Sequence, residues 1–180
     1  MPRTREEMKP LLQGDLDGLC GLYALINASR MAMPTLPKKK CQKVFYDSLR
    51  WLRARRGMPA MLCQGITHDI LVRLYNNVFQ QHWPNISKKH PFWGKARPQN
   101  RDDFFQRMKE EASRPNQGVF ISIGGTHDHW SVIREISDDR IYLFDSSGLK
   151  YLPRERCGNS EEDNFCHIIK PGYVILLSCE

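Results

Sequence analysis

Residues 13–28 read QGDLDGLCGLYALINA, and this stretch carries the strongest fold signal in the chain. From Cys20 to about Met31 the residues are apolar on nearly every side, which is typical of a central, buried helix. Pro34 and Pro37 follow closely and would end that helix. The sequence therefore predicts a buried helix that begins at a cysteine. That cysteine is either a small core hydrophobe or a reactive thiol.

The composition of the whole chain describes a single globular domain over residues 1–180. Hydrophobic residues make up 41% of the sequence, which suits a packed core rather than a disordered segment. No apolar run approaches the roughly 20 residues that cross a bilayer. The N-terminal stretch MPRTREEMKP also lacks the apolar segment of a signal peptide. We therefore expect no membrane span, and a protein that is cytoplasmic or is exported by a specialised secretion system.

The cysteines are spread singly along the chain, without the density of a disulfide scaffold, so we expect reduced thiols. They are Cys20, Cys41, Cys63, Cys157, Cys166 and Cys179. Cys157, Cys166, His167 and Cys179 could in principle bind zinc, but their spacing matches no compact ligand pattern. The sequence thus predicts no metal site and no cofactor.

Positive charge is concentrated in three short runs of a chain whose formal net charge is +7. The runs are KKK at 38–40, RARR at 53–56 and KKH at 88–90. Such runs usually form solvated helix faces and loops, and they also suit an acidic partner. No base-stacking aromatic residues are interleaved with them, so we do not expect a nucleic-acid partner.

Helical spacing of apolar residues marks a helical half, about 1–114, and β-rich runs mark a second half, about 115–180. This order predicts an α+β fold rather than alternating βαβ units. Further helices are expected at 41–56, 67–83 and 102–112, with Thr67 and Asn100 as N-caps. Strands are expected at 119–123, 129–136, 141–145 and 173–178, and loops at 85–99 and 153–164.

Cys20 has the surroundings that a nucleophilic cysteine needs. A cysteine attacks as a thiolate, which a helix N-terminus or a neighbouring imidazolium stabilises. A third side chain must orient the imidazole. The best candidates are His129, at the start of one expected strand, and Asp145, at the end of its hairpin partner. We therefore predict that Cys20, His129 and Asp145 act as nucleophile, base and orienting carboxylate.

The register of this hairpin decides whether Asp145 can reach His129. A symmetric turn at residues 138–139 would pair Asp145 with Val132 and turn it away from His129. A one-residue bulge pairs Asp145 with Ser131 instead, which makes His129 its diagonal neighbour on the same face. We therefore expect a bulge, or a loop of three or five residues. His127 would lie one pair further away, which favours His129.

Acyl transfer also needs donors for the oxyanion that forms on the substrate. The backbone N–H of Cys20 at the helix start is one candidate, and the neutral side-chain amide of Gln13 is a second. Gly18 and Gly21 flank the cysteine, and we expect them to leave room for a substrate backbone.

These residues form a pattern that resembles the papain-like cysteine peptidase superfamily. The pattern is Q-x6-CG-x-x-A-x-x-N over Gln13, Cys20, Gly21, Ala24 and Asn27, followed by HW-x-V at 129–132 and FD at 144–145. It looks most like compact bacterial members, such as the bacteriocin-processing double-glycine peptidases and cysteine-protease-like effectors. Those use an Asp as the third member, where papain has an Asn. The interval from Gln13 to Cys20 is one residue longer than in papain.

The resemblance implies a helical half led by the cysteine helix, packed on a twisted antiparallel sheet that bears the histidine and the aspartate. It implies thioester chemistry on a protein or peptide substrate, with the 84–99 and 153–164 segments as the expected cleft walls. The same triad also suits a glutamine deamidase or transglutaminase-like effector. A third interpretation is an inactive papain-like module that binds an acidic partner through its basic helices.

Overall fold

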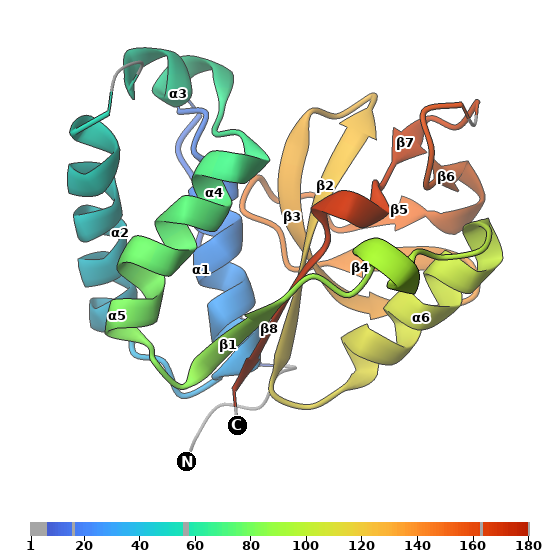
Figure 1. The fold of residues 1–180 in the computed structure, drawn as a ribbon, viewed down its shortest axis with the longest axis horizontal. Coiled ribbons are helices and arrows are strands. Elements are labelled where there is room, and N and C mark those ends of the chain that lie inside the picture. Colours follow the sequence, from blue (N-terminus) through green and yellow to red (C-terminus); the bar gives the residue numbers. More distant parts are fainter. Residues whose placement is uncertain (1–6, 16, 56–57, 163, 180) are drawn as a thin grey trace.

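The protein has an α+β fold in which helices cover both faces of an eight-stranded, mainly antiparallel sheet (Figure 1). The computed structural model describes residues 7–15, 17–55, 58–162 and 164–179. Within those ranges, no helix combines the length and the apolar character needed to cross a membrane. The combination of helices with a mainly antiparallel sheet confirms the α+β class expected from the sequence.

The helices lie mostly in the first two thirds of the chain. Those before the sheet-forming region are α1 (Cys20–Ala32), α2 (Lys38–Arg53), α3 (Met58–Gln64), α4 (His68–Leu74) and α5 (Gln80–His82), and α6 (Arg101–Ser113) follows them. A π-helical turn over Tyr75–Phe79 joins α4 to α5. Helix α1 begins at Cys20 and contains eleven buried residues, which confirms the predicted central helix.

Three helix predictions need correction. Helix α2 begins at Lys38 rather than Cys41, directly after extended Pro37, and the expected end at Arg56 lies outside the described residues. Helix α3 was not predicted, because Pro59 suggested a helix break. Pro59 lies instead in the first turn of α3. Proline is tolerated there because the N–H groups of the first turn have no intrahelical acceptors. Thr67 precedes α4 as expected, but its side chain makes no capping hydrogen bond.

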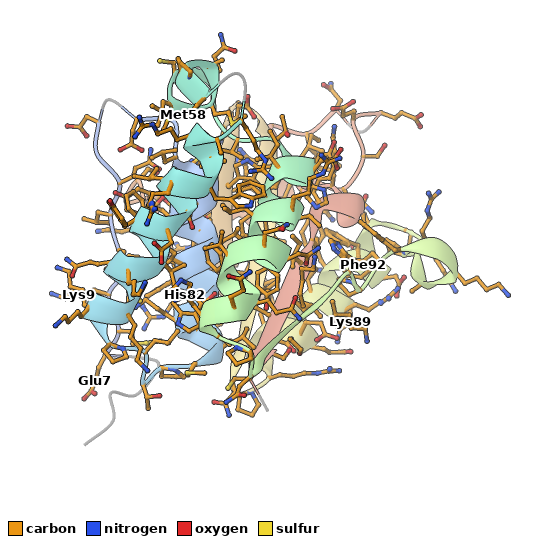
Figure 2. All side chains as sticks on the ribbon, turned by 60° about the vertical axis from the view of Figure 1, so that its left-hand side comes forward. Glu7, Lys9, Met58, His82, Lys89 and Phe92 are labelled. Carbon is orange, nitrogen blue, oxygen red and sulfur yellow. The ribbon has the colours of Figure 1, made fainter. Side chains whose placement is uncertain are left out.

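The outer helices form a second layer over α1. In Figure 2, α2 and the α4–α5 segment run side by side in the foreground, and His82 marks the end of α5. His82 Nε2 lies 2.9 Å from Asp47 Oδ2 of α2, which ties the two helices together. The capping prediction for α6 is confirmed, since the Asn100 side chain accepts from the backbone N–H of Asp103 at 2.9 Å.

The strands follow the order β1-β8-β2-β3-β4-β5, with β7 paired to β2 and to β6. They are β1 (Ile86–Lys89), β2 (Gln117–Gly125), β3 (His129–Ile136), β4 (Arg140–Leu143), β5 (Tyr151–Pro153), β6 (Cys157–Gly158), β7 (His167–Ile168) and β8 (Ile175–Cys179). The 85–99 and 153–164 segments are therefore not plain loops. The first contains β1, which pairs with β8, and the second contains β6, which runs parallel to β7.

The sheet is buried on both faces because its residues alternate between two cores. On β2, Phe120 belongs to the core formed with α1, whereas Val119 and Ile121 belong to the core formed with α6. Helix α6 thus covers the face opposite α1, although it comes from the helical half of the chain. Gly118 lets α1 approach closely, since a Cβ there would lie only 2.0 Å from the Ala28 carbonyl oxygen.

Candidate active site

The β3–β4 hairpin contains the predicted bulge. Near the turn Glu135 pairs with Tyr142, but further along Ile133 pairs with Leu143, so the register shifts by one residue between them. The bulge lies inside β3 rather than at the turn. Continuing the shifted register places Asp145 opposite Ser131, as the sequence predicted.

Asp145 receives hydrogen bonds on both carboxylate oxygens. Oδ2 lies 2.7 Å from His129 Nε2 and accepts from the Ser131 hydroxyl at 2.6 Å. Oδ1 accepts from the backbone N–H and the hydroxyl of Ser147, both at 2.7 Å, and from the Leu149 N–H at 3.2 Å. Burial of this 2% exposed residue would raise its pKa, but the bonds from His129, Ser131 and Ser147 outweigh it and hold the pKa well below its usual range.

Cys20 and His129 also meet. Cys20 is the first residue of α1 and is 7% exposed, and its side chain is close enough to the His129 imidazole to raise the pKa of that ring. Because Nε2 of His129 is bonded to Asp145, Nδ1 is the ring nitrogen left for the thiol. Burial would lower the pKa of His129, but hydrogen bonds and charge from Asp145 and Cys20 raise it to about 9. At neutral pH the imidazole is therefore protonated.

The preference for His129 over His127 agrees with this geometry. His127 stacks on the ring of His167 with centroids 5.2 Å apart, whereas His129 holds the carboxylate of Asp145. The structure thus brings Cys20, His129 and Asp145 together from α1, from the start of β3 and from the residues just after β4.

Gln13 lies beside the loop that follows Asp145. Its backbone N–H donates to the Ser146 carbonyl at 3.1 Å, and the Ser146 hydroxyl donates to its side-chain oxygen at 3.1 Å. Its amide nitrogen donates to the Asp17 carbonyl at 3.3 Å, so only the second amide hydrogen is left for an oxyanion. Asn27 of α1 fixes this segment, since its side chain exchanges hydrogen bonds of 2.9 and 3.0 Å with the Leu11 backbone.

The two glycines beside Cys20 make room for the protein itself, which corrects the expectation that they admit a substrate. A Cβ on Gly18 would lie 2.8 Å from the Gly65 nitrogen. A Cβ on Gly21 would lie 2.8 Å from a methyl carbon of Leu71. Both glycines are therefore needed so that the segment before α4, and α4 itself, can pack against the cysteine loop.

Two hollows flank the Cys20–His129 pair. One of about 260 Å³ is lined by Cys20, Ile66, His68, Trp130 and Tyr173, among others. The other, of about 470 Å³, is lined by His129 together with residues 126–128 and 147–149. Asp128 lines both hollows, so they meet at this exposed carboxylate.

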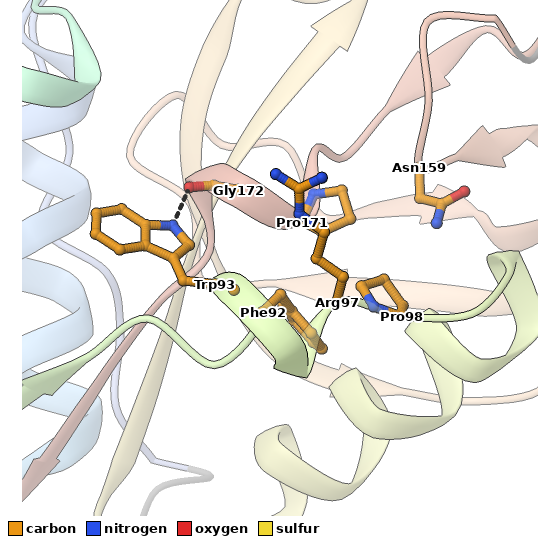
Figure 3. A pocket seen from close by; sticks show the side chains of 8 residues that line it. Phe92, Trp93, Arg97, Pro98, Asn159, Pro171 and Gly172 are labelled. Carbon is orange, nitrogen blue, oxygen red and sulfur yellow. Dashed lines mark hydrogen bonds between the residues drawn. The ribbon is translucent and has the colours of Figure 1, made fainter.

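The segments expected to wall the Cys20 cleft form a different cavity. Figure 3 shows this hollow of about 590 Å³, where the Arg97 side chain extends toward Pro171 and the Trp93 ring is turned toward Gly172. Trp93 Nε1 donates to the Gly172 carbonyl at 3.0 Å and closes one side. The walls of the Cys20 hollow come instead from residues 64–68, from β2 and β3, and from Tyr173. Pairing of β6 with β7 holds part of the 153–164 segment beside β7, which pairs with Gly124 and Gly125 at the C-terminal end of β2.

Sequence reasoning missed the side chains that support the site. Trp130 stacks on Phe120 with centroids 5.1 Å apart, and its indole N–H donates to the Ile66 carbonyl at 3.0 Å. It thereby anchors the segment before α4 beside Cys20. Ser131 was identified only as the residue opposite Asp145, and Ser147 was not identified at all. The sequence signals that could have identified them are their positions: Trp130 directly follows His129, and Ser147 lies two residues after Asp145.

Comparisons with protein-family models, with curated proteins and with solved structures found no match to this chain. Within the described residues, no three His, Cys, Asp or Glu side chains are grouped so that they could hold a metal ion. The geometry of the Cys20 site is therefore the basis for a functional assignment.

Proposed function

We propose that this protein is a papain-like cysteine peptidase that hydrolyses peptide or isopeptide bonds of a protein substrate. The observation that carries the proposal is the linked arrangement of thiol, imidazole and buried carboxylate. His129 holds Asp145 at 2.7 Å through Nε2, and its other ring nitrogen is left for Cys20 at the start of α1. Such an arrangement positions and activates a nucleophile.

The reaction begins when the Cys20 thiolate attacks the carbonyl carbon. A C–S bond forms and the carbonyl electron pair moves onto oxygen. The first turn of α1 has N–H groups without intrahelical acceptors, and that of Cys20 is placed to stabilise this oxyanion. The intermediate then collapses, the C–N bond breaks, and the His129 imidazolium gives its proton to the leaving amine.

Water completes the cycle by attacking the resulting thioester. Neutral His129 accepts a proton from that water, the C–S bond breaks, and the thiolate–imidazolium pair is restored. Asp145 keeps Nε2 protonated and the ring oriented throughout, because its Oδ2 is fixed by Ser131 and its Oδ1 by the 147–149 backbone. Asp145 is therefore a positioning residue in this mechanism.

The test is to incubate candidate protein substrates with the wild type and to examine them by intact-mass spectrometry. A peptidase produces two chain fragments, whereas deamidation leaves one chain heavier by about 1 Da, since the same thioester is hydrolysed on a side chain. We expect fragments, and none from Cys20→Ala. Cys63→Ala removes an exposed cysteine and is the matched control that should keep wild-type turnover. A mass shift without fragments would contradict the peptidase assignment.

A further inference from the structure

The hollow beside Cys20 has one exposed charge at its edge and an aromatic wall. The rings of His68, Tyr173 and Trp130 form a cluster, with the His68 centroid 4.9 Å from Tyr173 and 6.1 Å from Trp130, and 6.0 Å between the latter two. With Ile66, these rings give the hollow an apolar side. Asp128 supplies an exposed carboxylate at the point where the two hollows meet. A long apolar stem that ends in a cation matches this combination.

His68 contributes an acceptor that has no partner in the protein. Its side chain is 10% exposed, and Nε2 is buried without a hydrogen bond. Nδ1 faces Asp69 Oδ1 at 3.8 Å, which favours the tautomer with the proton on Nδ1. Nε2 is then a buried acceptor behind the aromatic wall of the hollow. Burial lowers the pKa of His68, so the ring stays neutral and does not repel a cation.

The other charges near the hollow do not cancel that of Asp128. In the ion-pair form of the proposed mechanism, Cys20 and Asp145 are negative and His129 is positive, so the three together are negative. Lys88 acts on His68 through its charge, but it does not line the hollow and its ammonium donates to Asn76 at 2.8 Å.

We propose that this hollow is a specificity pocket for a basic side chain of the substrate, arginine above lysine, with Asp128 as the residue that selects it. A guanidinium offers planar, paired donors that match a carboxylate and a flat face that stacks on aromatic rings, whereas an ammonium is a point charge. The inference rests on the proposed peptidase function and adds a substrate class to it. The protein itself has a net charge of +7, so a basic side chain would have to be attracted by the local charge of Asp128.

The test compares two peptidyl chloromethyl ketones that alkylate Cys20 and differ only in carrying arginine or its neutral isostere citrulline. The rate of Cys20 modification is measured by mass spectrometry and divided by the rate of each variant with iodoacetamide. We expect the arginine reagent to react about threefold faster in the wild type, as one charge pair at an exposed carboxylate allows. The ratio should fall close to one in Asp128→Asn. In Glu135→Gln, which removes an exposed carboxylate from the same strand as His129, the ratio should stay at the wild-type value.

A binding measurement keeps this inference separate from the proposed chemistry. Cys20→Ala cannot react, so the dissociation constants of benzoyl-arginine amide and benzoyl-citrulline amide can be compared by NMR shifts of the Trp130 indole. Tighter binding of the arginine compound that disappears when Asp128→Asn is added supports the pocket even if Cys20 proves unreactive. Equal binding of both compounds, or a preference that survives Asp128→Asn, would overturn the proposal.

Discussion

Asp145 is the residue that links the sheet to the chemistry. It is almost fully buried, yet each of its carboxylate oxygens has at least two donors, which is what a buried charge requires. Burial would lower the pKa of His129, and the hydrogen bond to Asp145, reinforced by the charge of the carboxylate, is the largest effect that raises it. In the proposed mechanism, the charge of the imidazole that serves Cys20 therefore depends on Asp145.

This dependence predicts the effect of Asp145→Asn on His129. With the charge removed, burial prevails and the pKa of His129 should fall from about 9 by roughly one unit or more. Turnover should drop about 100-fold, less than the loss from Cys20→Ala or His129→Ala. NMR titration of the His129 ring protons measures the pKa. An unchanged value in Asp145→Asn would show that the carboxylate does not control the imidazole.

Among the secondary-structure elements, one bulge in β3 and a few contacts between distant segments bring the site residues together. The bulge in β3 turns Asp145 toward His129, and it was predicted because only a shifted register puts these two residues on the same face. The walls of the Cys20 hollow were not predictable in this way. They depend on contacts between distant segments, such as the Trp130 bond to Ile66 and the stacking of His68 on Tyr173. No local spacing encodes such contacts.

The close approach of α1 to the sheet predicts a steric effect at Gly118. Gly118→Ala would place a Cβ 2.0 Å from the Ala28 carbonyl oxygen, so α1 must move away from β2. We expect a loss of about 3 kcal/mol or more in the free energy of unfolding, measured by denaturant titration. Gly172→Ala is the matched control, because a Cβ there meets nothing within 4 Å. Equal stability of the two variants would contradict the packing described for α1.

For the whole molecule, the α+β class could be predicted from the sequence. The places of β1 and α6 in the sheet and its cores could not. Helix α1 was recognised because it is apolar all round, and the long β-rich runs were recognised by composition. Strand β1 was missed because ISKK is short and carries two lysines, and only pairing with β8 makes it a strand. Helix α6 was assigned to the helical half, but it closes the second core on the opposite face of the sheet. Such pairings depend on tertiary structure rather than on local sequence.

Global stability should vary with pH because of His129. Its pKa is about 9 in the folded protein and about 6.5 when unfolded, so between these values the folded state binds more protons. The stabilisation is complete below pH 6.5 and is lost as the pH rises through 9. We expect a fall on the order of 1 kcal/mol in Cys20→Ser, where no thiolate forms to offset the proton that His129 binds. His129→Gln should show a much flatter profile over this window, and an identical slope in both proteins would contradict the charge assigned to His129.

The most direct test of the central claim is the rate at which iodoacetamide alkylates each cysteine at neutral pH, followed by peptide mass spectrometry. Cys63 is exposed and Cys41 is buried, and burial raises the pKa of the Cys41 thiol. If exposure alone decided reactivity, Cys63 would react first. We predict that Cys20, although buried, reacts about tenfold faster than Cys63, and that His129→Ala removes this advantage. A Cys20 rate no higher than that of Cys63 or Cys41 would contradict the activated thiolate and the peptidase mechanism that depends on it.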